Sequence, residues 1–393
     1  FTKEGAEWYL RIFIDKPEGV NIDDCVNMTH AINPVLDQED PISQEYMLEV
    51  SSPGINRKLT RQEHFEAFLE APVLVKLIRP LENGVRELEG ILIDVMENGD
   101  FEVIIEEEPE TIISGYYITT SMLIGLGQAD KLVGVENTPE KRPVYGLSAP
   151  ALLELPTLGT VKEFDLEECA VINPDLVILP YKLKDITPSL EQLDIPVLVV
   201  KPETQELLAE TIAMLGDAAG CAEEASEMQA FIDTELAELE TALADVTVPS
   251  VYLAGNSSML STAGPEMYQH CLIANGGGKN VAEELTDTYW AEISYEQLLA
   301  WDPEVIILAA DAAYTVEDVL NDKVLANCTA VKNNAVYRIP NEIECWDSPV
   351  PGSVLGSLWL ASVLHGDIYP AAEYEAAVTE FYETFYGFTP ELN

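Results

Sequence analysis

The pattern of apolar and polar residues changes character near residue 107 of this chain. Before that point, short strand-type runs are separated by Gly and Pro, at residues 8–15, 45–50, 73–80, 86–96 and 100–107. Runs of this kind predict β-strands. One long helix is expected after Asn21, with Asp23 and Asp24 in its first turn, and a short helix is expected near Thr60. The pattern predicts a small α+β domain over residues 1–70 and the first strands of a small β-barrel over residues 71–106.

Short buried runs alternate with helical patterns from Glu106 onward. TIISG at residues 111–115 is β-branched and ends in Gly, which suits a first buried strand. Residues 119–127 then carry apolar side chains at helical spacing, and residues 130–135 return to an extended run. This order predicts a parallel α/β sheet. We therefore expect two independently folding units, with a boundary between Val103 and Ile113 that limited proteolysis would cut.

An internal repeat divides the second part into two lobes. Residues 165–179 read DLEECAVINPDLVIL, and residues 294–308 read SYEQLLAWDPEVIIL. Both segments have Glu at the third place, Pro at the tenth, an acid at the eleventh and then an apolar run. Each copy predicts a helix, a Pro turn and a central parallel strand. Two similar α/β lobes in tandem are the simplest explanation of the repeat.

A single long helix is predicted between the two copies, over residues 221–246. This segment lacks Gly and Pro and has apolar residues at helical spacing. At 1.5 Å per residue the helix would be roughly 35 Å long. We expect it to join the lobes 107–220 and 247–393 as a stiff spine that permits little closure of one lobe on the other.

Composition disfavours several classes of protein. The chain has 70 Asp and Glu against 20 Lys and Arg, and its net charge of −50 repels DNA and anionic membrane surfaces. Six Cys and four His are scattered without ligand spacing, so neither a zinc site nor a disulfide framework is expected. No apolar run is long enough for a transmembrane helix, and no signal segment follows Phe1, as in a fragment or a processed chain.

The N-terminal part carries a family resemblance in the segments LRIFIDKPEGVNIDDC, LDQEDPI and YMLEVSSPGINRKL. Over about residues 1–105, these resemble the N-terminal domain of the RimP-type ribosome maturation factor. The resemblance implies a partial Sm-like β-barrel over residues 71–106, a cytoplasmic location and a contact with the small ribosomal subunit. Arg57, Lys58 and Arg61 are the basic residues available for that contact; the alternative is a turn whose charges face water.

A second resemblance covers about residues 107–393, in the segments SMLIGLGQADKLVGVE, LPTLGTVKEFDLEECAVINPDLVILP, EISYEQLLAWDPEVIILA and FYETFYGF. These resemble the helical-backbone substrate-binding proteins, extracytoplasmic receptors of ABC importers for iron-siderophores, haem and cobalamin. The resemblance implies a membrane-associated receptor that is not an enzyme, has no resident cofactor or metal, binds a metal chelate and delivers it to an ABC permease. A gene fusion, or an error in joining two sequences, would explain modules of different compartments in one chain.

In a two-lobe α/β fold the ligand sits between the lobes, at the strand ends and the loops that follow them. Aromatic and polar residues of those predicted loops are the candidates, and each of them could equally serve packing or the surface. They are Tyr116, Tyr117, Tyr145, Thr160, Lys162, Tyr181 and Lys182 in the first lobe, and Ser261, Thr262, Tyr289, Trp290, Glu344, Trp346 and Asp347 in the second. The GGGKN segment at residues 276–280 lacks phosphate-loop spacing and is expected to end a helix.

Glu167 and Glu296 occupy the third place of the two repeat copies, near the start of a helix. The helix dipole favours a carboxylate there, which is one explanation of both. In the family that the second part resembles, acids at these positions pair with arginines on the two permease subunits. The resemblance therefore implies that Glu167 and Glu296 dock the receptor onto its transporter.

Three functions remain: a solute receptor, a ribosome-assembly factor, and an enzyme with a nitrogenase-like or hydrolase α/β fold. The chain has no nucleophile elbow, dinucleotide loop or metal-ligand cluster, so no catalytic residue is predicted and the enzyme is least favoured. Ligand titration would identify the receptor, and co-sedimentation with the ribosomal subunit would identify the assembly factor.

Overall fold

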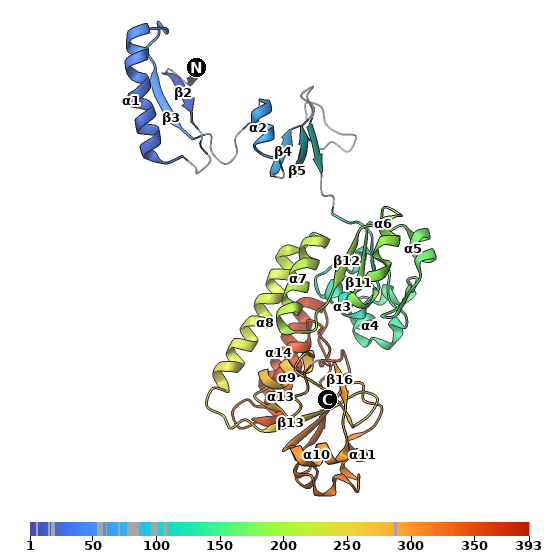
Figure 1. The fold of residues 1–393 in the computed structure, drawn as a ribbon. Coiled ribbons are helices and arrows are strands. Elements are labelled where there is room, and N and C mark those ends of the chain that lie inside the picture. The colour runs from blue at the N-terminus through green and yellow to red at the C-terminus, as the bar shows by residue number, and fades with distance from the viewer. Residues whose placement is uncertain are drawn as a thin grey trace. The chain divides into compact units, whose positions relative to one another are not determined.

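The structure is a computed structural model, which describes residues 1–4, 7–14, 16, 20–52, 58–59, 61–69, 71–76, 86–95, 101–104, 108–286 and 289–392. The chain divides into two compact units, residues 1–107 and 108–393. In Figure 1 the first unit is blue, and the second runs from green to red. Within the described residues, no helix combines the length and the apolarity needed to cross a membrane.

The first unit begins with a three-stranded sheet and one helix. Strands β1 (Thr2–Glu4) and β2 (Glu7–Phe13) are antiparallel, whereas β2 and β3 (Met47–Ser51) are parallel and are joined by α1 (Ile22–Glu39). Asn21 caps α1 as the sequence predicts. Its side chain accepts the backbone N–H of Asp24 at 3.0 Å, and the Asp24 carboxylate accepts the backbone N–H of Asn21 at 2.9 Å.

A second small sheet follows in the same unit. After α2 (Gln62–Glu66), strands β4 (Pro72–Lys76), β5 (Glu87–Val95) and β6 (Phe101–Ile104) pair antiparallel in the order β4-β5-β6. These are the strands predicted for the partial barrel. Of the residues predicted to contact the ribosome, Lys58 and Arg61 are exposed, and Arg57 lies outside the described residues, as does Thr60.

The second unit contains two parallel sheets with the same strand order, one in each lobe (Figure 1). Lobe 1 (residues 108–204) holds β7 (Ile112–Ser114), β8 (Leu132–Gly134), β11 (Leu176–Pro180) and β12 (Val197–Val200), in the order β8-β7-β11-β12. Lobe 2 (residues 250–364) holds β13 (Ser250–Ala254), β15 (Lys279–Asn280), β17 (Val305–Leu308) and β18 (Val336–Arg338), in the order β15-β13-β17-β18. In each sheet the first strand lies between the second and the third, which leaves a crevice at its carboxyl end.

The two repeat copies form the same structure, as predicted. Helices α5 (Leu166–Ile172) and α10 (Tyr295–Trp301) are capped by the first residue of each copy, Asp165 and Ser294. Both helices end in a residue with a left-handed backbone, Asn173 at φ 52° and Asp302 at φ 42°. Pro follows at once and prevents further helix, so the chain enters the central strand.

The acid at the eleventh place of each copy holds the start of the adjacent strand. One Asp175 carboxylate oxygen accepts the backbone N–H and the hydroxyl of Thr111, at 2.8 and 2.7 Å. One Glu304 oxygen likewise accepts the backbone N–H and the hydroxyl of Ser250, at 2.8 and 3.1 Å. The repeated acid therefore ties the first strand of each lobe, β7 or β13, to the central strand beside it.

Two antiparallel helices, α7 (Gln205–Ala219) and α8 (Ala222–Ala242), lie between the two sheets in the sequence. Helix α8 is the predicted spine, but it ends four residues before residue 246. Leu243 is buried where the chain turns toward β13, so the helix stops when its apolar stripe has been covered. The 21 residues of α8 span roughly 32 Å.

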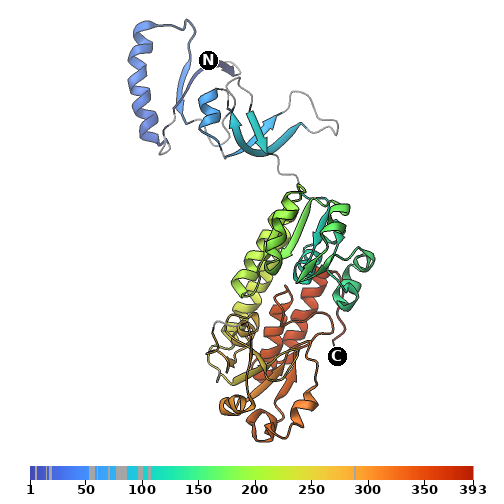
Figure 2. The same ribbon diagram turned by 45° about the vertical axis from the view of Figure 1, so that its right-hand side comes forward.

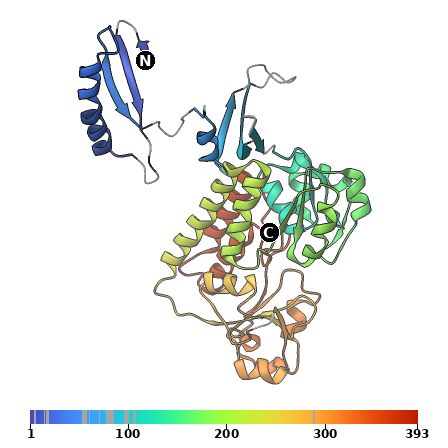
Figure 3. The ribbon, with the colours of Figure 1, turned by 45° about the horizontal axis from the view of Figure 1, so that its top comes forward.

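The C-terminal segment (residues 371–388) packs against α8. It comprises α14 (Ala371–Phe381) and a π-helical turn, η6 (Tyr382–Tyr386), and it follows α13 (Ser353–Leu364) of lobe 2. The rings of Phe381 and Phe231 of α8 have centroids 5.5 Å apart. The red C-terminal helices lie beside the yellow-green pair α7–α8 in Figures 2 and 3.

The remaining elements are short and flank these sheets. The helices are α3 (Tyr117–Gly125), α4 (Pro143–Ser148), α6 (Thr187–Glu191), α9 (Tyr268–Asn275), α11 (Val316–Leu320) and α12 (Thr329–Lys332). Two antiparallel ribbons pair β9 (Gly159–Thr160) with β10 (Glu163–Phe164) and β14 (Ser261–Ala263) with β16 (Trp290–Glu292). Short 3-10 helices lie at Ala129–Lys131, Pro139–Lys141, Pro150–Glu154, Tyr181–Ile186 and Leu325–Asn327. Residues 130–135, predicted as a strand throughout, thus begin with a helical turn. GGGKN follows the end of α9, as predicted, with Gly277 at φ 77°.

Replacing Asp175 by Asn should lower the free energy of unfolding of the second unit by about 1 kcal/mol, because a charged acceptor is lost from the start of β7. The hydrogen bonds from Thr111 hold the pKa of Asp175 below its ordinary value, so this stabilisation exists above that ordinary pKa and is lost as the pH falls. The difference from wild type should therefore narrow between pH 7 and about pH 3. Denaturant unfolding followed by tryptophan fluorescence measures it; Glu154→Gln, an exposed carboxylate of the same lobe, is the control. Equal effects of both variants would contradict the assignment.

Candidate functional site

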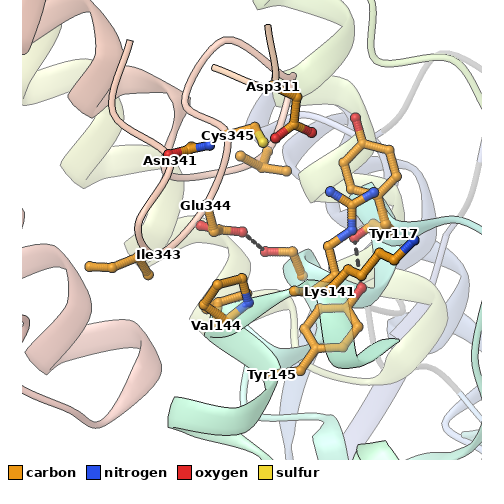
Figure 4. A pocket seen from close by; sticks show the side chains of 13 residues that line it. Tyr117, Lys141, Val144, Tyr145, Asp311, Asn341, Ile343, Glu344 and Cys345 are labelled. Carbon is orange, nitrogen blue, oxygen red and sulfur yellow. Dashed lines mark hydrogen bonds between the residues drawn. The ribbon is translucent and has the colours of Figure 1, made fainter. Parts of the chain in front are cut away.

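A cavity of about 230 Å³ lies between the two lobes (Figure 4). Lobe 1 contributes Tyr117 and Ser121 of α3 and residues 141–145, which follow β8. Lobe 2 contributes Asp311, which follows β17, and part of residues 340–347, which we call the cleft loop. Because all these segments follow parallel strands, the cavity occupies the crevice that the strand order leaves.

Arg142 and Lys141 bring positive charge to the lobe 1 wall of this cavity. The Arg142 guanidinium carbon lies 4.1 Å from the ring centroid of Tyr117, a cation–π contact. The Tyr117 hydroxyl donates to Ser348 Oγ at 3.0 Å, which fixes the ring under the guanidinium. Within residues 108–286 and 289–392, the Arg142 side chain makes no ion pair or hydrogen bond, so its donors remain for a ligand.

Glu344 is the buried carboxylate of the cleft loop, and a dashed line in Figure 4 marks a hydrogen bond at its side chain. One carboxylate oxygen accepts the Ser121 hydroxyl, and the other accepts the Tyr382 hydroxyl at 3.2 Å. Tyr386 contacts Ser121 from the same side, with their hydroxyls 3.0 Å apart. Burial raises the pKa of Glu344 to about 7, although both hydrogen bonds act in the opposite direction. This network joins α3, the cleft loop and the C-terminal segment.

Glu136 does not line the cavity, but it binds a residue that does, Tyr145. It follows β8, is 7% exposed and accepts the hydroxyls of Tyr145 and Thr120 at 2.7 and 2.8 Å. Burial raises the pKa of Glu136 above its ordinary value. The Tyr145 hydroxyl also lies 3.3 Å from the carbonyl oxygen of Tyr117, so this network sets the relative position of two cavity residues.

A second group of aromatic and basic residues spans both lobes. Lys201, just after β12, lies 5.8 Å from the ring centroid of Tyr181 in lobe 1 and 5.9 Å from that of Tyr289 in lobe 2. A hydrogen bond with Tyr289 raises the pKa of Lys201. Lys184 donates to the Tyr181 hydroxyl at 2.7 Å. We call Tyr181, Lys184, Lys201 and Tyr289 the basic rim.

Tyr116 and Tyr117 connect the cavity with the basic rim. Their ring centroids are 5.4 Å apart. Tyr117 lines the cavity, and Tyr116 lies within electrostatic reach of Glu203, which in turn interacts with Lys201. Glu203 Oε2 is covered and has no hydrogen-bond partner in the described part of the chain. The two groups are therefore neighbouring parts of one inter-lobe surface.

The side chains of the cavity can be compared with those of a metal site. No group of three or more His, Cys, Asp and Glu with metal-binding geometry occurs in the described residues. Burial raises the pKa of Tyr117 to about 12, and it raises the pKa values of Tyr145 and of the Cys345 thiol well above their ordinary values. The phenols and the thiol are thus protonated near neutral pH, whereas a metal-bound thiolate or phenolate must lose its proton.

The predicted ligand residues fall into three groups. Tyr117, Tyr145 and Glu344 line the cavity. Tyr116, Tyr181 and Tyr289 lie in or beside the basic rim, and Lys182 lies within electrostatic reach of Glu203. The others lie elsewhere: Ser261, Thr262, Trp346 and Asp347 are buried, Thr160 and Lys162 are exposed at the β9–β10 ribbon, and Trp290 lies in β16. Their contact with a ligand stays a prediction.

Asp347 shows why a polar residue of the cleft loop need not face the cavity. Its carboxylate accepts the backbone N–H of Ala310 at 3.1 Å, and its carbonyl oxygen accepts the Gln269 side chain at 2.8 Å. Burial raises the pKa of Asp347 to about 6. Its side chain therefore holds the cleft loop to the end of β17.

Glu167 and Glu296 are both exposed, each in the first turn of its helix, at matching places of the two lobes. Neither lines the cavity. Both carboxylates are thus presented to solvent in the same local setting.

The predictions from the sequence did not include Lys141, Arg142, Asp311 and Lys201. The signal was present for three of them, because Lys141 and Arg142 follow the extended run predicted at residues 130–135 and Asp311 follows the central strand predicted for the second repeat copy. Charge was a second signal: only eleven of the 20 basic residues fall after residue 107, and three of those eleven are among these four.

Comparison with known proteins agrees with this architecture. Residues 112–343 match the family model described as periplasmic binding protein, and residues 1–56 match the model described as the RimP N-terminal domain. The molybdate periplasmic binding protein MolA of Haemophilus influenzae is a similar solved structure, with 22% identity, a TM-score of 0.65, and coverage of 75% of this chain and 98% of MolA.

Two further solved structures are similar. A periplasmic solute-binding protein of Veillonella parvula is 24% identical, with a TM-score of 0.64 over 81% of this chain and 94% of its own. Helicobacter pylori CeuE, in a structure with Ni-His, is 20% identical, with a TM-score of 0.62 over 76% of this chain and 96% of its own. At these identities the likeness establishes the fold of the second unit.

Replacing Glu344 by Gln should change how stability depends on pH. The pKa of Glu344 is raised in the folded state, so between about pH 4.5 and 7 the folded protein keeps a proton on this carboxyl group that the unfolded chain has lost. The free energy of unfolding of the wild type therefore falls as the pH rises through this range. The wild-type melting temperature should decline across this range more steeply than that of Glu344→Gln. Glu342→Gln, an exposed neighbour in the same loop, should behave as wild type. Parallel melting curves for wild type and Glu344→Gln would refute the role of this carboxyl group.

Proposed function

This chain belongs to the periplasmic binding protein family, whose members are non-enzymatic solute receptors, and we propose that its ligand is a compact anionic metal chelate of the iron-siderophore class. The observation that carries this proposal is the wall of the inter-lobe cavity. It combines the cations Lys141 and Arg142 with the aromatic ring of Tyr117 and the carboxyl groups of Asp311 and Glu344, and the described residues contain no cluster of metal ligands.

The sign of the ligand charge follows from the unpaired cations. Residues 108–393 hold eleven Lys and Arg against 47 Asp and Glu, yet Lys141, Arg142 and Lys201 all lie on the inter-lobe surface. Asp311 and Glu344 of the same cavity oppose the cations, and Glu203 interacts with Lys201, but Glu344, with its pKa raised to about 7, is only partly ionised near neutral pH. An anionic ligand gains charge-assisted hydrogen bonds from these cations, whereas a cationic ligand would be repelled.

The volume of the cavity restricts the size of the ligand. About 230 Å³ is less than the roughly 300–1,000 Å³ typical of pockets for drug-sized molecules. A compact chelate can occupy this space and extend over Tyr116 toward the basic rim. The same volume disfavours haem and corrinoids, which resemblance alone left among the candidates.

The metal must arrive already chelated. The phenols of Tyr117 and Tyr145 keep their protons near neutral pH and donate them to Ser348 and Glu136, so neither supplies a phenolate to a metal ion. Tyr117, with Arg142 stacked on it, offers an aromatic face and a fork of donors at one place.

Ligand titration by tryptophan fluorescence tests the proposal, with ferric citrate as the compact anionic chelate and cyanocobalamin and haem as bulky alternatives. Ferric citrate should bind, and Arg142→Gln should weaken this binding about tenfold, equivalent to about 1.4 kcal/mol. Arg142→Lys should retain part of the affinity, because it keeps the charge but loses the planar fork. Lys323→Gln, an exposed cation of lobe 2, is the control. Binding of cyanocobalamin or molybdate, and of no iron chelate, would overturn the proposal.

Delivery to a permease is the second half of the function. The matching exposure of Glu167 and Glu296 supports a docking role, because one carboxylate per lobe can fix the orientation of the receptor on a two-subunit permease. Neither lines the cavity, so ligand binding and docking use separate residues. This role also requires an extracytoplasmic, membrane-associated location of the second unit.

Charge reversal separates docking from ligand binding. The pair Glu167→Lys and Glu296→Lys should abolish transport in vesicles reconstituted with the permease, with ligand affinity unchanged. The control pair is Glu168→Lys and Glu317→Lys, which reverses exposed charges in the first turns of α5 and α11. Transport that survives the first pair, or is lost equally with the control pair, would contradict the docking role.

The first unit has a second candidate function. The match of residues 1–56 to the RimP N-terminal domain supports a contact with the small ribosomal subunit, with Lys58 and Arg61 exposed on that unit. Co-sedimentation of the full chain with purified small subunits is the measurement that decides it, and no co-sedimentation at low salt would reject it.

A further inference from the structure

A second cavity lies behind the cleft loop, on the side opposite the inter-lobe cavity. Its volume is about 150 Å³, and it is bounded by the cleft loop, α13, α14 and residues 391–392. Ile343 lines both cavities, whereas Glu344 and Cys345 line only the inter-lobe one and Trp346 only the second. In Figure 4 the side chain of Ile343 points away from that of Glu344. We call this second space the rear cavity.

Three of the eight residues that line the rear cavity are aromatic. Trp346 of the cleft loop is 4% exposed, Trp359 of α13 is 8% exposed, and Tyr374 of α14 completes the set. The Trp346 indole N–H donates to the Tyr382 hydroxyl at 3.0 Å, so this donor is already used. What Trp346 can still offer a ligand is its ring, whose face carries negative charge density.

Two carboxylates add to this negative potential without a cation from the chain. Glu342 and Glu391 line the rear cavity, and both are exposed. The sequence has no Lys or Arg after Arg338, and neither carboxylate forms an ion pair within the described residues. The Glu342 carboxylate accepts only the backbone N–H of Asn341, at 3.1 Å, among those residues.

We propose that the rear cavity binds a small organic cation of the quaternary ammonium type. Aromatic faces attract such cations through their quadrupole, and the two carboxylates supply the counter-charge. A space of about 150 Å³ is of the size that holds a benzene molecule in a protein interior, so a trimethylammonium group fits. This site is separate from the cation-lined inter-lobe cavity, and the two have opposite charge preference.

The test compares choline with 3,3-dimethylbutan-1-ol, a neutral molecule of the same shape, by calorimetry and tryptophan fluorescence on the full chain. Choline should bind at least about tenfold more tightly than the alcohol, because only choline gains the cation–π and carboxylate attraction. Equal binding of both would show a merely apolar cavity and overturn the proposal, as would no binding of choline at millimolar concentration.

Variants locate the binding in the rear cavity. Glu342→Gln removes a charge and keeps the acceptor for Asn341, so it should weaken choline binding several-fold without lowering the melting temperature. Glu375→Gln, on α14 but outside the cavity lining, is the matched control. Trp359→Leu should remove the binding, with circular dichroism to verify the fold. Choline affinity unchanged in Glu342→Gln, or lowered equally in Glu375→Gln, would place the binding elsewhere and refute the site.

Discussion

The inter-lobe surface depends on one buried carboxyl group, that of Glu344. A carboxylate out of water costs free energy unless donors surround it, and here the donors come from two other parts of the chain, Ser121 of α3 and Tyr382 of the C-terminal segment. Any displacement of α3 or the C-terminal segment leaves a buried polar group unpaired. The position of the cleft loop, and with it the cavity wall of lobe 2, is therefore fixed by the same contacts that hold the lobes together.

We therefore expect a preformed site, with little closure of one lobe on the other. Helix α8 connects the lobes covalently, and Phe231 on it packs against Phe381 of the C-terminal segment, so the two lobes share a continuous core. A rigid connection of this kind opposes large hinge closure, and a ligand must then be recognised by groups that are already in place. Arg142 stacked on Tyr117, and Tyr145 held by Glu136, are such groups, because their partners belong to lobe 1 alone.

The sequence predicted the fold more completely than the site, for a physical reason. Caps, Pro turns and buried strand runs are local, so the repeat and the cap at Asn21 could be read directly from neighbouring residues. The direction of a loop side chain is set by tertiary contacts. The indole N–H of Trp346, a predicted ligand contact, donates to Tyr382, and the carboxylate of Asp347 accepts the N–H of Ala310; neither direction could be read from neighbouring residues. Lys141 and Arg142 were not predicted because they lie at the junction of the one-turn helix Pro139–Lys141 and α4. The packing of these two helices places both residues at the cavity, and this packing cannot be read from neighbouring residues in the sequence.

The net charge of the whole chain affects how the proposed anionic ligand approaches the inter-lobe surface. A net charge of −50 repels an anionic chelate at long range, but in physiological salt this field decays over about 8 Å. Lys141 and Arg142 line the inter-lobe cavity itself, so their contacts with the proposed chelate would lie within that distance. Attraction must therefore come from contact and not from steering. Added salt should therefore have two effects on the proposed chelate. It screens the long-range repulsion and so speeds association, whereas it weakens the partly buried contacts of the bound chelate only slightly.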